Sequence, residues 1–280
     1  MVQGLWIKLF PTYDRELPLD TLKAPVKKWI ELGGGYGLPD TYSPQGPFFL
    51  YNPAKVPNPP KTVDELKKWI EEHPGKFMYA RMANSGPGRC FVQALPYLLK
   101  DKNPSDPVNG WDKTWAYLKD IGKYIDYYPS GTTQTLKELA GGTRWIIASS
   151  MEWDMHPRAM GTVPMNVKVF SLQGTTLVSD AAYWVIPKGV SKRELEVVLD
   201  LMKFMLRPEQ QALTYGGYIG PVVKGATLSL APKSIQDEVG EVWRDMYTNV
   251  EDKYEIVTQL GAKELVTGFD LWDRQVGSKK

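Results

Sequence analysis

A short apolar strand, a proline-rich turn and a capped helix follow one another near residue 50, and they constrain the fold more than any other stretch. The strand is predicted at Phe48–Tyr51, and three prolines between residues 57 and 60 exclude regular structure directly after it. Thr62 and Glu65 have the spacing of a capping box, which predicts a helix that begins there. A strand that passes quickly into a helix is the basic unit of an α/β fold.

The same alternation continues along the chain. Gly and Pro separate short runs rich in β-branched and aromatic residues from longer stretches with an apolar residue every three or four positions. The predicted strands are 77–80, 145–148, 167–170 and 182–186, and the predicted helices include 20–32, 132–140 and the stretches after 191 and 207. The sequence therefore predicts an α/β fold.

Composition excludes several classes of protein. Lys and Arg number 34 against 32 Asp and Glu, and a net charge of +2 does not favour a nucleic-acid surface. No apolar run approaches the ~20 residues that span a bilayer. Cys90 is the only cysteine, so an intrachain disulfide is excluded. A length of 280 residues permits one large domain or two smaller ones.

Five segments resemble one known family in the expected order. They are YNPAKV with PPKTVDELKKW (51–69), the helix, Gly and strand unit at 132–150, DAAYWVIPKG (180–189), LDLMKFMLRPEQ (199–210) and YGGYIGP (215–221). Together they resemble the extracellular solute-binding proteins of ABC importers over about residues 36–230, and the nearest branch is the spermidine/putrescine-binding group. The resemblance implies a two-lobed periplasmic-binding-protein-like (type II) α/β fold with hinge crossings. It also implies solute capture without chemistry.

The resemblance also implies a domain arrangement and a compartment. One lobe is expected at 47–178, and 1–46 with 179–280 are expected in the other. Residues 1–10 lack the features of a signal peptide. The first residues instead resemble a segment that lies well inside the first lobe of the family. The first lobe is therefore expected to be incomplete, which leads to the expectation of a homodimer. The family implies a periplasmic or extracellular location, an ABC permease partner and no cofactor.

The loop 81–90 is the first candidate site. Polyamine binders of the family hold acidic residues there, but this loop has none and carries Arg81, Ser85 and Arg89. Backbone N–H groups at a helix start favour an anion, and the arginines would add charge-assisted hydrogen bonds. We therefore expect a small polar or anionic organic solute in preference to a polyamine. The alternative is a Pro/Gly turn with solvated arginines.

Two further candidate sites follow or form predicted strands. Ser150 and Trp153 come after the strand 145–148, where ligands of open α/β sheets lie, so Ser150 is expected to donate a hydrogen bond and Trp153 to stack. Asp180, Tyr183 and Trp184 lie on the segment that resembles the second crossing and are expected to contact the solute. The alternatives are an ordinary loop exit and a hinge residue satisfied by backbone donors.

A carbohydrate-active enzyme is the second class of function. Glu152 and Asp154 would be its paired carboxylates, but their spacing alone does not establish the ~5–9 Å separation that glycoside hydrolysis needs. Cys90 with His156 lacks an orienting third group, which favours an inert buried cysteine. The scattered His and Cys residues give no metal-ligand spacing, and no dinucleotide, P-loop or G-x-S-x-G motif is present. Binding without turnover would favour the solute-binding class over this one.

Overall fold

The computed structural model describes residues 4–279, which divide into two compact units. Unit 1 takes the described residues up to Ser43 together with Asp180–Glu241. Unit 2 takes Pro44–Ser179 and the described residues from Val242 onward. The chain therefore passes between the units three times, and strands β1 (Gly37–Gly46) and β6 (Leu177–Val185) carry the first two passages.

The C-terminal segment differs from the predicted domain limits. Residues 242–280 were expected with the lobe formed by the start of the chain, but their described part packs within unit 2. The reason is an apolar helix face that the prediction overlooked. Trp272 is buried in the core of unit 2, and Leu265 and Phe269 pack against the same core.

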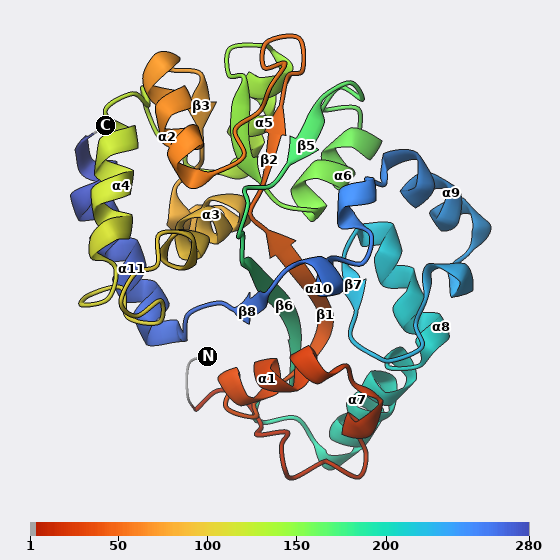
Figure 1. Cartoon of the computed structure of the whole chain (residues 1–280). Coiled ribbons are helices and arrows are strands. Elements are labelled where there is room, and N and C mark those ends of the chain that lie inside the picture. Colours follow the sequence, from red (N-terminus) through yellow and green to blue (C-terminus); the bar gives the residue numbers. More distant parts are fainter. Residues whose placement is uncertain (1–3, 280) are drawn as a thin grey trace. The chain divides into compact units, whose positions relative to one another are not determined.

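The sheet of unit 2 contains four strands in the order β3-β4-β2-β5 (Figure 1). Strand β3 is parallel to β4, whereas β2 is antiparallel to both of its neighbours. The predicted strand at Phe48–Tyr51 is confirmed as β2, and the strand predicted at 145–148 is β4 shifted by one residue. The bounds are β2 Phe48–Tyr51, β3 Phe77–Met78, β4 Ile146–Ser149 and β5 Lys168–Phe170.

Helices cover both faces of this sheet. The capped helix is confirmed as α2, because Thr62 Oγ1 accepts the Glu65 N–H (3.1 Å) and the Glu65 carboxylate accepts the Lys61 N–H (2.8 Å). Pro96 lies inside α3. The helices of unit 2 are α2 Val63–Glu72, η2 Met82–Asn84, α3 Gly86–Leu98, α4 Asp112–Gly122, α5 Thr132–Ala140, α6 Glu152–Ala159, η5 Asp245–Tyr247, α10 Val250–Lys253, α11 Ala262–Gln275 and η6 Gly277–Lys279.

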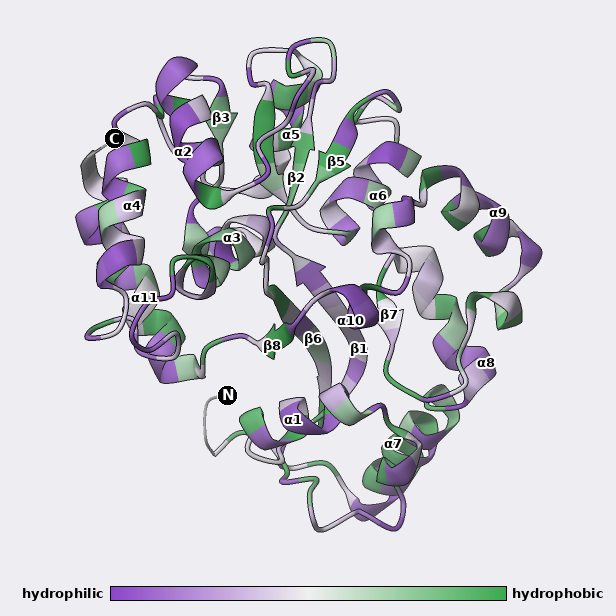
Figure 2. Ribbon diagram, viewed as in Figure 1, coloured by the Kyte–Doolittle hydropathy of each residue, from purple (hydrophilic) through white to green (hydrophobic). Residues whose placement is uncertain are grey.

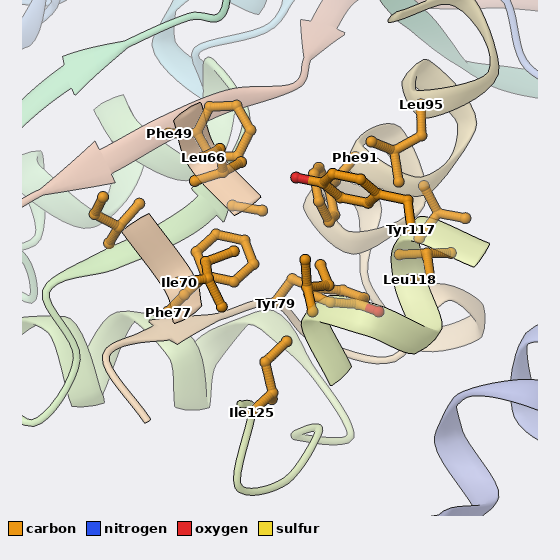
Figure 3. Close-up of a cluster of buried hydrophobic side chains, with 14 of the residues drawn as sticks. Phe49, Leu66, Ile70, Phe77, Tyr79, Phe91, Leu95, Tyr117, Leu118 and Ile125 are labelled. Atoms are coloured by element: carbon orange, nitrogen blue, oxygen red, sulfur yellow. The ribbon is translucent and has the colours of Figure 1, made fainter. Parts of the chain in front are cut away.

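Alternate residues of the strands divide the core of unit 2 between these two faces. On one face, Phe49 and Phe77 meet buried residues of α2, α3 and α4, with side chains pointing toward one another (Figure 3). On the other face, Leu50 and Ile147 pack against Leu136 of α5. Strand β2 is hydrophobic along its length, whereas α2 and α4 carry hydrophilic residues as well (Figure 2). The sheet is thus fixed from both sides.

Unit 1 has its own core and strands. Within unit 1, strand β1 pairs antiparallel with β7. The first residues of β6 belong to unit 2, where they pair in parallel with β8 (Ile256–Thr258). Leu38, Tyr42 and Ile186 are buried against α1 and α7. The elements of unit 1 are η1 Leu19–Thr21, α1 Ala24–Leu32, α7 Lys192–Met205, α8 Pro208–Gln211, η3 Ala212–Gly217, β7 Gly220–Pro221 and η4 Leu228–Leu230, while α9 Lys233–Val242 ends one residue beyond it.

Within the described part of the chain, every helix is too short or too polar to cross a membrane.

Candidate functional site

The strands of unit 2 bring three chain segments to one edge of its sheet. Because β3 and β4 are parallel and β2 is antiparallel to β4, with Phe48 opposite Ser149, two strand ends and one strand start lie together. We call this edge the carboxyl edge of unit 2. The segments are the first turn of α3, residues 149–153 after β4, and residues 45–46 before β2. Ligands of open α/β sheets bind outside such edges.

Gly86, Gln45 and Trp153 meet at the carboxyl edge. A methyl group placed on Gly86 would lie 3.7 Å from Gln45 Oε1 and 3.9 Å from Trp153 Nε1. Gln45 is buried, and its Nε2 donates to Glu152 Oε2 at 3.3 Å. Gln45 Oε1 has no hydrogen-bond partner among residues 4–279. The site thus presents a carbonyl acceptor and an indole N–H donor beside a glycine.

Two serine hydroxyls lie at the end of β4, Ser149 as its last residue and Ser150 directly after it. Ser149 and Ser150 are fully buried, and neither Oγ atom has a partner in the described part of the chain. The Met151 N–H donates to the Gln45 carbonyl at 2.9 Å, which holds this segment beside the start of β2. Buried hydroxyls are nearly always hydrogen-bonded in native proteins, so two unpaired ones in sequence indicate a polar ligand or ordered water.

The start of α3 offers fewer N–H groups than the sequence suggested. Ser85 is buried, and its Oγ accepts the Gly88 N–H at 3.0 Å and bonds Thr132 Oγ1 at 2.7 Å. Pro87 has no N–H, so Gly86 is the first-turn residue left to meet a ligand. Gly88 itself is required by packing, because a Cβ there would lie 2.2 Å from the Ala80 carbonyl oxygen.

Both predicted arginines are directed to the C-terminal segment of unit 2. Arg81 forms an ion pair with Asp273 (2.9 Å) and its guanidinium lies 5.6 Å from the Trp272 ring centroid. Arg89 donates to Gln259 Oε1 at 3.2 Å and lies 5.7 Å from the Phe269 ring centroid. These contacts fasten the C-terminal segment, including α11, to α3 and to the residues just before it. The sequence could not reveal them, because the partners lie about 170 to 190 residues further along the chain.

The predicted residues of β6 belong to unit 1. Tyr183 donates to the Trp29 carbonyl oxygen at 2.6 Å and packs against Gly37, where a Cβ would lie 2.9 Å from its ring. Burial, together with the charge of Asp180, raises the pKa of Tyr183 well above its usual value. Asp180 Oδ1 accepts the Ala181 N–H, and Trp184 is half-buried against the core of unit 1. Asp180, Tyr183 and Trp184 thus belong to unit 1, whereas the carboxyl edge belongs to unit 2.

The proposed pair of catalytic carboxylates is not arranged as one. Glu152 and Asp154 lie on α6, which the sequence had suggested was a loop. Asp154 is fully buried and accepts hydrogen bonds from Arg158 (2.6 Å) and Tyr247 (2.8 Å), so it faces the protein interior. Cys90 is likewise buried, while His156 is exposed on α6. Residues 4–279 contain no group of three or more metal-ligating His, Cys, Asp or Glu side chains.

Ser150, Trp153 and the loop that contains Gly86 were named from the sequence and lie at the carboxyl edge, whereas Gln45 was not named. Gln45 carried a weak signal, since a polar residue three positions before an apolar strand is also typical of an ordinary turn. Its partner Glu152 lies 107 residues away, and only the pairing of β2 with β4 brings the two together.

Comparison with known proteins identifies a family. The family described as bacterial extracellular solute-binding protein matches residues 5–240 of the chain. No curated protein sequence matches it. Solved structures share the fold at low sequence identity, and three of them illustrate the range.

An ABC transporter protein from Clostridium perfringens is 16% identical, with a TM-score of 0.70 over 98% of this chain and 78% of its own. A spermidine/putrescine ABC transporter substrate-binding protein from Streptococcus pneumoniae is 16% identical, with a TM-score of 0.63 over 99% and 79%. A periplasmic binding protein from Actinobacillus pleuropneumoniae, solved with fructose-6-phosphate bound, is 13% identical, with a TM-score of 0.63 over 98% and 77%. These likenesses establish the two-lobed α/β fold of periplasmic binding proteins.

Proposed function

Because this chain belongs to the family of bacterial extracellular solute-binding proteins, we propose that the carboxyl edge of unit 2 binds the solute that it delivers to an ABC permease. The observation that carries this proposal is the meeting of Gln45 Oε1 and Trp153 Nε1 beside Gly86. The unpaired hydroxyl of Ser150 lies on the same edge. A ligand there would satisfy buried polar groups that the chain itself leaves unpaired.

The solute that suits this edge is small and polar, with both donor and acceptor groups. Gln45 Oε1 would accept a hydrogen bond from the solute, Trp153 Nε1 would donate one, and Ser150 would do either. The anionic preference expected from Arg81 and Arg89 is weakened, because each guanidinium already contacts the C-terminal segment, although Arg89 Nε has no partner within residues 4–279. A neutral or zwitterionic solute therefore fits better than a polyanion.

Other predicted contacts remain part of this proposal in a reduced role. Ser85 would act by capping α3 and so positioning Gly86. Asp180, Tyr183 and Trp184 stay candidate contacts of unit 1, with Asp180 as the group that suits a ligand amine. The relatives named above carry unlike solutes, so they do not choose among these chemistries.

Native mass spectrometry of freshly purified protein would identify a captured solute, and calorimetry would then measure its affinity. Trp153→Phe keeps the ring but removes the N–H, so we expect affinity to fall about tenfold, which corresponds to one hydrogen bond of ~1.4 kcal/mol. Trp145→Phe is the matched control, because Trp145 precedes β4 at the opposite end of the strand. Equal affinity in both variants, or an equal loss in both, would contradict the assignment.

The family places such proteins outside the cytoplasmic membrane, and we propose a periplasmic or extracellular location here. The permease subunits are the implied partner. Neither the family nor the fold supports the homodimer expected from the sequence.

A further inference from the structure

A buried cluster of charged groups in unit 2 has no role in the proposed solute site. It consists of Asp154 and Arg158 on α6 with Arg244 and Tyr247 near the start of the C-terminal segment, and we call it the two-arginine cluster. Asp154 and the Arg158 side chain are completely buried. Long charged side chains are almost never fully buried unless they are paired, so the pairing decides what this cluster does.

The Arg158 guanidinium is only partly satisfied. Its Nε donates to Asp154 Oδ1 at 2.6 Å, and one terminal nitrogen donates to the Pro164 carbonyl oxygen at 2.9 Å. The second terminal nitrogen is buried without a partner among residues 4–279. This N–H group can be satisfied only by something that the chain does not supply.

The Arg244 guanidinium is satisfied even less. Its Nε lies 3.7 Å from Asp154 Oδ2, too far for a good hydrogen bond, and that oxygen already accepts the Tyr247 hydroxyl at 2.8 Å. Arg244 Nε and one terminal nitrogen are buried without partners in the described part of the chain. Its side chain is 22% exposed, so the cluster reaches the protein surface at Arg244.

The charges of the cluster do not balance. Two guanidinium groups flank one carboxylate, and burial raises the pKa of Tyr247 well above its usual value, so the phenol stays neutral. Burial also lowers the pKa of Arg158, and the positive charge of Arg244 lowers it further. The cluster thus holds one excess positive charge together with at least three buried nitrogens that can donate.

We propose that Arg158 and Arg244 bind a small inorganic anion of halide size, such as chloride. An anion beside the two guanidinium groups would neutralise the excess charge and accept from the unpaired nitrogens, and the complete burial of the Arg158 side chain favours a small anion. The cluster uses none of the groups assigned to the solute, so this site is independent of the proposed function.

Thermal unfolding of the full chain in sodium chloride and in sodium gluconate, at equal ionic strength, tests the proposal. We expect the midpoint to be about 2–4 °C higher in chloride, since a ligand that binds only the native state stabilises it. Arg244→Gln should abolish this difference, yet it should fold, because Asp154 and Arg158 remain as a one-to-one pair.

Arg274→Gln is the matched control, because it removes the same charge from an exposed ion pair with Asp270 and should keep the difference. Crystals grown in bromide provide a second measurement, with an anomalous peak expected between the two guanidinium groups. The proposal is overturned if wild-type protein shows no chloride effect, if both variants keep it, or if bromide does not occupy the cluster.

Discussion

Asp154→Asn should be among the most destabilising isosteric substitutions in this chain. The change removes the only negative charge between Arg158 and Arg244 while it leaves the volume unaltered, so no cavity term enters. The amide also replaces one of the two accepting oxygens with an NH2 donor. Because Arg158 Nε donates to one carboxylate oxygen and the Tyr247 hydroxyl to the other, one of these two donors would lose its acceptor. Breaking one partner of a buried ion pair costs about 3–5 kcal/mol, and the full burial of Asp154 justifies that range.

Urea denaturation followed by far-UV circular dichroism measures this loss. We expect the urea concentration at the midpoint to fall strongly while the slope of the unfolding free energy with urea stays unchanged. This result would show that the substitution lowers stability without changing the surface exposed on unfolding. Asp270→Asn is the matched control, since it breaks an exposed pair with Arg274 and should cost less than about 1 kcal/mol. If Asp154→Asn lost no more than this control, the charge of the buried carboxylate would have little structural role and the reasoning would be wrong.

Two further predictions concern the periphery of unit 2. Arg81→Ala should speed amide exchange in α11 by roughly tenfold, because it removes the contacts with Asp273 and the Trp272 ring, and solute affinity should stay unchanged. A loss of affinity without faster exchange would assign Arg81 to the ligand instead. Hydrogen bonds from Lys123 and Lys67 lower the pKa of Asp120 from 3.8 to about 2. The charged carboxylate therefore stabilises the folded state at pH values above the pKa of Asp120 in the unfolded chain. At this exposed site the contribution is under about 1 kcal/mol. The stability gap between wild type and Asp120→Asn should therefore vanish as the pH falls toward 2, and a gap that grows in acid would refute the assignment.

The sequence predicted the elements whose signals are local. The helix after Thr62 formed as expected because its cap lies within four residues, and β2 and β4 are short apolar runs buried on both faces. Strand β1 was missed because Pro39 and Pro44 lie within it and read as loop. Its pairing with β7, about 180 residues away in the chain, supplies the strand partner that no local pattern could show.

Helix α11 is a different case, because its signal was present. Leu265, Phe269 and Trp272 fall on one helical face, and they account for the assignment of the C-terminal segment to unit 2. The resemblance to known solute-binding proteins ends near residue 230, so it carries no information on which lobe this segment joins. Only part of the candidate site could be predicted from the sequence. Residues after a buried strand can be named from sequence, whereas the partner across the sheet cannot.

The carboxyl edge of unit 2 is polar, and several of its side chains already have partners within the chain, which limits how it can select a solute. Arg89 is bound to the C-terminal segment, Ser85 caps α3, and Gln45 donates to Glu152. Gln45 Oε1 and the Ser150 hydroxyl have no partner within residues 4–279, and both are neutral groups at fixed positions. Such groups discriminate by the cost of leaving one of them unpaired, which exceeds the gain from any single contact. Specificity at this edge should therefore depend on hydrogen-bond geometry at Gln45 and Trp153, with net charge of the solute as the weaker term.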